Sequence, residues 1–397
     1  MEKPKIRFKG YQEDWEQRKF IDIATRESSV CTSAVDIPSV EYEDVVSEEG
    51  RLNKDIRSKE TVKSGITFDG SQVLYGKLRP YLHNWLNPDF KGIAVGDWWV
   101  LKPINMDKNF LYRLIQTQQF DNIANQSSGS KMPRADWNLI SNSEFMVPPS
   151  KEEQSKIGRY FDSLDHFITL HQRKCEEMKT LKKYMLQKMF PQNGQSVPQI
   201  RFSGFTEDWE QRKLEDYLEV SSEKNRDELF GKEDVLSVSG EVGIVNQIEF
   251  QGRSFAGASV ANYGIVEVGD VVYTKSPLKS NPYGIIKTNK GKTGIVSTLY
   301  AVYKPKENVD SEFVQIYFES DFRMNSYMHP LVNKGAKNDM KVSDANALKG
   351  PVFFPKIEEQ IAISQYFNSL DHLITLHQQK CDELRNIKKF MLQNMFI

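Results

Sequence analysis

The chain has 397 residues, of which 39% are hydrophobic and 27% are charged, and its formal net charge is −1. This length exceeds one ordinary hydrophobic core and predicts two domains, while the composition excludes a disordered or fibrous protein. A protein that binds nucleic acid unaided usually has a clear basic excess, so the near-neutral charge counts against nucleic-acid binding without a partner.

The cysteines and the chain start indicate the compartment. No apolar run approaches the roughly 20 residues that cross a bilayer, and the opening "MEKPKIRFKGYQEDWE" lacks the apolar core of a signal peptide. Only three cysteines occur, at Cys31, Cys175 and Cys381. Because no two of them are two residues apart, a disulfide framework or zinc ribbon is disfavoured, and we expect a cytoplasmic protein.

The first motif in the chain occurs twice. "IRFKGYQEDWEQRKF" spans residues 6–20 and "IRFSGFTEDWEQRKL" spans residues 200–214, and eleven of the fifteen positions are identical. Trp15 and Trp209 lie at the same place in the two copies. A tryptophan can stack on a base, but packing against a helix end or a partner subunit is the favoured prediction.

The regions that follow each motif have diverged and predict mixed α/β structure. The runs "DGSQVLYG", "GIAVGDWWVLKP", "VGDVVYTK", "GIVSTLYAVYKP" and "GPVFFP" are marked by Gly and Pro and predict short strands. Residues 108–126 and 311–328 each have helical apolar spacing. Each region is therefore expected to be a compact α+β module.

A second, longer block also occurs twice, at residues 152–190 and 358–396, with 25 of 39 positions identical. Seam residues in both copies step by four and three over four heptads, which predicts coiled-coil helices. Each rod is expected to be about 60 Å long, and an antiparallel pair would place one module at each end. The seam residues are Ile157, Phe161, Leu164, Ile168, His171, Cys175, Met178, Lys182, Met185 and Met189, and their counterparts 206 residues later.

The sequence contains several partial matches to enzyme motifs, and each of them lacks an essential residue or spacing. "NKGKTG" at residues 289–294 lacks the first glycine of a phosphate loop, and "SNPYG" at residues 280–284 has one proline where amino-methyltransferases have two. Pro88-Asp89 has no suitably spaced acidic-x-Lys partner for a nuclease site. His166 and His171 are five residues apart and cannot chelate one metal from one helix face. No catalytic or metal-ligating residue is predicted.

With catalytic and metal-binding patterns excluded, the recognition of a nucleic acid is the function that the residues favour. Both diverged regions are locally basic, with thirteen basic and seven acidic residues over 51–134, and eleven and six over 271–341. Lysine and arginine suit phosphate contacts, and arginine and asparagine suit base edges. The candidate DNA-binding residues are Lys77, Arg79, Tyr81, His83, Lys131, Arg134, Lys275, Lys279, Asn281, Lys334, Lys337, Asn338 and Lys341.

This arrangement resembles the specificity (S) subunit of type I restriction–modification systems. The likeness covers the whole chain and rests on the twin "DWEQRK" segments, the twin "EEQ…YF.SLDH.ITLHQ.KC" helices, "LYGKLRPYL" and "PPSKEEQ". The resemblance implies two target recognition domains that each read one half of a split DNA site. It also implies docking of two modification (M) subunits that bind S-adenosylmethionine, and restriction (R) subunits that use ATP and Mg²⁺. This chain itself would bind no cofactor.

The predicted fold is therefore α+β, with two mixed α/β recognition domains, two long antiparallel coiled-coil helices and an internal pseudo-twofold repeat. The predicted boundaries are 1–147 for the first domain, 148–190 for its helix, 191–199 for a linker, 200–354 for the second domain and 355–397 for its helix. The predicted docking residues are Trp15, Arg18, Trp209, Arg212, Tyr160, Phe161, Tyr366 and Phe367. The alternatives are a coiled-coil scaffold that binds proteins or RNA, and a free-standing methyltransferase or nuclease, which the failed motifs disfavour.

Overall fold

The structure is a computed structural model that describes residues 3–59, 61–126, 132–192, 194–275, 281–334 and 340–397; for residues 333, 334, 340 and 341 only the backbone is described. Its internal contacts divide the chain into two compact units. The first unit comprises Met1–Arg173 with His377–Ile397, and the second comprises Lys174–Leu376. None of the helices in the described residues combines the length and the hydropathy that a membrane span requires.

The first unit is built on two four-stranded sheets. One sheet has the order β2-β11-β8-β9, with every neighbouring pair antiparallel, and the other has the order β3-β7-β10-β4. The strands of the first sheet are β2 (Ala24–Glu27), β8 (Val73–Gly76), β9 (Trp85–Leu86) and β11 (Trp98–Pro103). Those of the second are β3 (Val30–Thr32), β4 (Ser39–Val40), β7 (Ser64–Phe68) and β10 (Gly92–Ala94).

Short elements complete the module of the first unit. The repeated motif forms strand β1, which pairs antiparallel with β12 just before the long helix. These elements are β1 (Glu16–Lys19), α1 (Phe20–Ile23), η1 (Tyr42–Asp44), β5 (Val45–Val46), β6 (Arg51–Leu52), η2 (Ile56–Ser58), η3 (Pro80–Leu82), α4 (Trp137–Asn142) and β12 (Glu144–Val147).

The second unit contains a sheet with the same antiparallel order, β14-β21-β18-β19. Its strands are β14 (Leu218–Val220), β18 (Val271–Thr274), β19 (Ile286–Thr288) and β21 (Tyr300–Pro305). The repeated motif again forms a strand, β13 (Glu210–Lys213), which pairs with β24 (Pro351–Phe354). The remaining elements are η4 (Leu214–Asp216), η5 (Lys232–Asp234), β15 (Leu236–Ser239), β16 (Gly243–Asn246), α6 (Gln247–Gln251), β17 (Gly264–Val266), β20 (Gly294–Val296), β22 (Asn333–Lys334), β23 (Met340–Lys341) and η6 (Asn346–Leu348).

The two single helices predicted inside the modules are each broken into two, so that prediction was wrong. The first forms α2 (Lys108–Leu114) and α3 (Gln118–Ala124), and the second forms α7 (Ser311–Phe318) and α8 (Asp321–Met328). Thr117 and Ser320 cause the breaks, because each side chain caps a new helix by accepting a backbone N–H three residues later. The apolar spacing continues across the breaks, so it did not reveal them.

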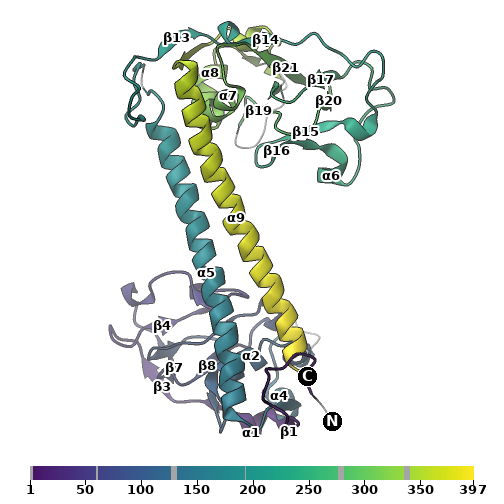
Figure 1. The fold of residues 1–397 in the computed structure, drawn as a ribbon. Coiled ribbons are helices and arrows are strands. Elements are labelled where there is room, and N and C mark those ends of the chain that lie inside the picture. Colours follow the sequence, from purple (N-terminus) through teal and green to yellow (C-terminus); the bar gives the residue numbers. More distant parts are fainter. Residues whose placement is uncertain (1–2, 60, 127–131, 193, 276–280, 335–339) are drawn as a thin grey trace. The chain divides into compact units, whose positions relative to one another are not determined.

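The predicted long helices are confirmed as α5 (Lys151–Lys188) and α9 (Ile357–Met395). In the first unit they pack against each other in opposite directions (Figure 1). As the residue numbers increase along α5, the numbers of the residues they contact at α9 decrease. The ring of Phe161 lies 6.2 Å from that of Phe396, and the Nδ1 atoms of His171 and His377 lie 2.9 Å apart. Between these points Cys381 donates through Sγ to the carbonyl of Ile168 at 3.6 Å.

The other halves of the helices pack in the same opposed sense in the second unit. The ring of Phe190, which follows α5, lies 6.1 Å from that of Phe367. Further along, Lys182 pairs with Asp371 at 2.7 Å. Every predicted seam residue is buried or half-buried, which confirms the heptad interpretation.

An arginine from the repeated motif clamps the start of each long helix. In the first unit Arg7 makes a bidentate ion pair with Glu153 at 2.7 and 2.8 Å. In the second unit Arg201 makes the same pair with Glu359 at 2.6 and 2.7 Å. Both carboxylates are almost completely buried, so the paired guanidinium offsets a large desolvation cost.

Candidate nucleic-acid interface

Three charged side chains gather beside the end of strand β8 in the first unit. Lys77 follows the strand directly, and its Nζ lies 3.5 Å from Oδ1 of Asp97. Arg134 comes from a distant segment and lies beside them, with Nη2 at 3.0 Å and Nε at 3.3 Å from the Asp97 carboxylate. The arginine hydrogen bond, followed by the charges of Arg134 and Lys77, lowers the pKa of Asp97, which therefore stays ionised at neutral pH.

The loop that carries the predicted residues 77–83 has an unusual backbone. Arg79 and His83 both have left-handed φ angles, of 49° and 52°, on either side of η3. This conformation costs a non-glycine residue about 1–2 kcal/mol, and such residues are concentrated at functional sites. Hydrogen bonds hold the loop, because the Arg79 N–H donates to the carbonyl of Pro133 at 2.7 Å. Tyr81 is 52% exposed on the same loop.

His83 does not join this charged cluster. Its Nε2 lies 2.9 Å from the carboxylate of Asp121, and its ring stacks on Trp85 at 5.2 Å. Both rings line a cavity of about 610 Å³ that α5 and α9 also border within the first unit. The ion pairs of His83 are therefore different from those of Lys77 and Arg134.

Among the predicted residues of the second unit whose side chains the structure describes, Lys275 makes a comparable ion pair. Lys275 follows strand β18, and its Nζ lies 2.9 Å from Oδ1 of Asp344. Asn281 instead lines a cavity of about 510 Å³ that Lys182 and Lys287 also border. Lys334 and Lys341 lie in the paired strands β22 and β23, where only the backbone is described. Lys131, Lys279, Lys337 and Asn338 lie outside the described residues.

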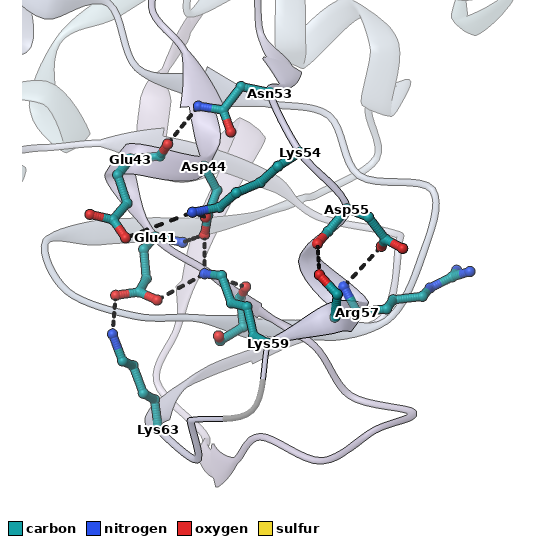
Figure 2. Close-up of polar contacts among 11 residues, drawn as sticks. Glu41, Glu43, Asp44, Asn53, Lys54, Asp55, Arg57, Lys59 and Lys63 are labelled. Atoms are coloured by element: carbon teal, nitrogen blue, oxygen red, sulfur yellow. Dashed lines mark hydrogen bonds and ion pairs between the residues drawn. The ribbon is translucent and has the colours of Figure 1, made fainter.

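A further ionic network in the first unit was not predicted (Figure 2). Lys59 lies between the carboxylates of Glu41 and Asp44, and Lys63 pairs with Glu41. Lys54 lies 3.0 Å from Asp44. Burial raises the pKa of Glu41 and of Asp44, but the lysine hydrogen bonds outweigh it and lower both. No periodic sequence pattern points to this network, because all its members except Asp44 lie outside the helices and strands.

Four of the predicted docking residues are buried in the chain's own core. For Trp15 and Trp209 this agrees with the predicted packing against a helix end rather than with docking of a partner. Trp15 and Trp209 are 4% and 2% exposed, and Phe161 and Phe367 are fully buried. The Trp15 ring packs on Phe110 and Phe396 at 6.0 and 6.2 Å. These side chains stabilise their own unit and present no surface for a partner.

The other predicted docking residues lie at or near the surface. Tyr160 and Tyr366 are half-buried and pack on Phe8 and Phe202, at 5.9 and 5.8 Å. Arg18 is half-buried and donates to the carbonyl of Asp22 at 2.9 Å. Arg212 is exposed and pairs with Glu210. These four remain predictions for contact with a partner.

The long helices carry exposed apolar side chains that the sequence reasoning missed. In the first unit these are Phe167 and Leu170 on α5 and Phe390 on α9, which are 48%, 40% and 55% exposed. In the second unit the residues at the matched positions of the repeat are Leu373, Leu376 and Tyr184, and all three are exposed. A signal was available, since these apolar residues lie off the seam of the heptad pattern. Among the described residues, no group of three or more His, Cys, Asp or Glu side chains could hold a metal ion.

The chain is similar in sequence to specificity subunits of type I restriction enzymes. Residues 12–180 match the model of the type I restriction modification DNA specificity domain. A Methanocaldococcus jannaschii protein named as the type I restriction enzyme MjaX specificity subunit is 24% identical, over 95% of this chain and 91% of its own length. The MjaVIII specificity subunit of the same organism is 21% identical, over 72% and 68% of the two chains.

Solved structures resemble this fold along its whole length. The crystal structure of the type I restriction–modification system S subunit from M. genitalium aligns with a TM-score of 0.60 at 13% identity, and it covers 100% of this chain and 99% of that one. A chain from a structure described as concerned with complex assembly and conformational transition of the type I R-M system aligns with a TM-score of 0.50 at 15% identity, and it covers 96% and 97% of the two chains. At these identities the likeness concerns the fold alone.

Proposed function

The chain belongs to the family of type I restriction–modification DNA specificity subunits, and from this premise we propose that its two modules read the two halves of a split, asymmetric DNA site. The predicted domain boundaries, 1–147 and 200–354, would then delimit the two readers. The observation that supports this best is that the two central sheets share one strand order while their loops carry different residues. Different side chains at base edges read different half-sites.

The long helices would set the spacing between the half-sites. A helix of 38 or 39 residues is stiff over about 57 Å, and about 3.4 Å per base pair makes this roughly 17 base pairs. The two helices would be held in register by equivalent contacts, since Lys388 pairs with Asp165 in the first unit and Lys182 pairs with Asp371 in the second. Changing the helix length would change the spacer and leave both half-sites intact.

Two M subunits would dock on the repeated surface of the helices. The exposed apolar residues recur at matched positions, with Phe167, Leu170 and Phe390 in one unit and Leu373, Leu376 and Tyr184 in the other. Apolar side chains left exposed on an otherwise polar helix are typical of protein interfaces. Two matched sets supply one site for each of two copies of one partner.

In this proposal the chain is a non-catalytic subunit that acts in the cytoplasm. The M subunits would bind S-adenosylmethionine and methylate adenine, and R subunits would use ATP and Mg²⁺ to cleave DNA. The chain itself would contribute DNA recognition and the platform for assembly. The relatives support this division of labour, because they are named as specificity subunits.

Methylome sequencing tests the proposal directly. The chain is expressed with its M subunit in a host that lacks other adenine methylation, and we expect methylated adenines in one bipartite motif. Exchanging residues 21–147 for the same region of a relative should change one half of the motif and leave the other half unchanged. The proposal fails if no adenine is methylated or if the exchange alters both halves.

A further inference from the structure

The lysine that follows the central strand is paired with a carboxylate in both modules. We propose that Asp97 in the first unit and Asp344 in the second are countercharges that limit the affinity of each module for DNA of any sequence. This inference rests on the proposed function, because it takes DNA phosphate as the ligand of the two lysines.

The position of Asp97 is held by the backbone as well as by its ion pairs. Its carbonyl accepts the Lys77 N–H at 2.9 Å and the Tyr42 O–H at 2.7 Å. The Tyr42 oxygen in turn accepts the Leu78 N–H at 3.0 Å. One carboxylate is thus fixed between the cations of Lys77 and Arg134, where it cancels part of their positive potential.

In the second unit the carboxylate that pairs with the equivalent lysine, Lys275, comes from a different segment of the fold. The Lys275 N–H donates to the carbonyl of Leu299 at 3.3 Å, so Leu299 occupies the backbone position that Asp97 has in the first unit. The carboxylate comes instead from Asp344, in the segment before η6. Asp344 is also held, because its carbonyl accepts the Tyr303 O–H at 3.1 Å.

This difference argues for a role that the common fold does not explain. An ion pair inherited with the fold would have its carboxylate at the same position in both units. Here the lysine is shared, in "VLYGK" and "VVYTK", whereas each module supplies its own carboxylate. The Arg134 side chain is 55% exposed, and an ion pair as exposed as this contributes little to folding stability. Lys77 and Lys275 are 30% and 22% exposed, so all three cations are at least partly open to solvent.

The expected consequence is electrostatic. Binding to DNA of any sequence depends almost entirely on phosphate contacts by lysine and arginine. A carboxylate fixed within 3.5 Å of these cations repels an approaching phosphate, and the cations must exchange one anion for another. Because a genome offers a large excess of non-specific sites, a lower affinity for them leaves more of the protein free to find its own site.

The test uses the full chain in complex with its M subunits. Asp97→Asn and Asp344→Asn each remove one charge and keep the side-chain size. The matched control is Asp36→Asn, which removes the same charge from an exposed ion pair with Lys91 at 2.9 Å. The probe is a duplex of about 30 base pairs of mixed sequence, and its binding is measured by fluorescence anisotropy at several salt concentrations.

We expect Asp97→Asn and Asp344→Asn to tighten binding of this duplex by about three- to tenfold relative to Asp36→Asn, with a steeper dependence on salt. The inference is overturned if both variants bind within twofold of Asp36→Asn, or more weakly. If Asp97→Asn fails to fold, the inference is tested by Asp344→Asn and by Asp97→Leu, which introduces the residue found at the equivalent position, Leu299. If the unmodified complex binds no duplex in a salt-dependent way, the proposed function itself fails.

Discussion

Oδ1 of Asp165 lies 2.7 Å from Nζ of Lys388, and the Oδ2 atom of the same carboxylate lies 2.7 Å from Arg113. One aspartate on α5 thus serves a lysine on α9 and an almost completely buried arginine on α2. The matching aspartate of the second unit, Asp371, pairs with Lys182, but Ile316 stands at the position of Arg113. The two equivalent aspartates therefore differ in their ion pairs, because only Asp165 also neutralises a buried arginine.

This inequality predicts unequal costs of substitution. Asp165→Asn should lower the free energy of unfolding by about 2–3 kcal/mol, because it leaves a buried guanidinium with only Asp162 as its counterion. Asp371→Asn should cost about 1 kcal/mol or less, because Lys182 keeps Glu319 at 2.8 Å and Asp371 is 43% exposed. Urea unfolding of the two variants measures the difference. Equal costs would show that Arg113 does not depend on Asp165.

Trp15→Ala should destabilise the fold before it affects assembly. The substitution opens a cavity among Phe110, Phe396 and their neighbours, and removing a buried tryptophan costs about 3–5 kcal/mol. Thermal unfolding of the isolated chain should show the loss. Trp15→Phe, which keeps most of the packing, should restore most of the stability. A Trp15→Ala chain with unchanged melting but impaired M-subunit binding would return Trp15 to a docking role.

Phe167→Asp and Leu373→Asp should each weaken binding of one M subunit. Both positions are exposed on the long helices, at 48% and 38%, so a charged residue is tolerated by the free chain and opposes an apolar partner. Size-exclusion chromatography with light scattering should show complexes with one M subunit for each single variant and none for the double variant. The control is Val35→Asp, at a position that is 90% exposed on the first module. Full occupancy by two M subunits in the double variant would contradict the docking proposal.

The network around Lys59 should make the stability of the chain sensitive to acid. The pKa values of Glu41 and Asp44 are lowered below their ordinary values of 4.5 and 3.8. Their contribution is therefore fully present above pH 4.5 and is lost as the pH falls through the lowered pKa values. Glu41→Gln should reduce stability at pH 7 and shrink the loss of stability between pH 7 and about pH 3.

Urea unfolding at the two pH values measures this effect. Glu43→Gln is the matched control, since the Glu43 side chain is 72% exposed and lies 3.8 Å from Lys54. We expect the control to keep the acid sensitivity of the unmodified chain. An acid sensitivity that is unchanged in Glu41→Gln would assign the effect to other carboxylates.

The sequence by itself predicted the long helices, several strand-forming runs and the resemblance to type I specificity subunits. Heptad spacing from Ile157 to Met189 and repeated motifs are local properties, and they are visible in the order of residues alone. Even the break between α2 and α3 had a local signal in Thr117, a residue type that caps helices. The ion pairs between charged side chains could not be predicted from the order of residues alone.

Only the tertiary structure decided the surroundings of each candidate residue. Lys77, Asp97 and Arg134 are far apart in the chain and meet through strand pairing, and Trp15 is buried because Phe396, at the other end of the chain, packs against it. Burial and ion pairing depend on contacts between residues distant in sequence, and those contacts exist only after the sheets and helices have packed. The same physics explains why the sequence could suggest Lys275 as a candidate DNA-binding residue but could not reveal its partner, Asp344.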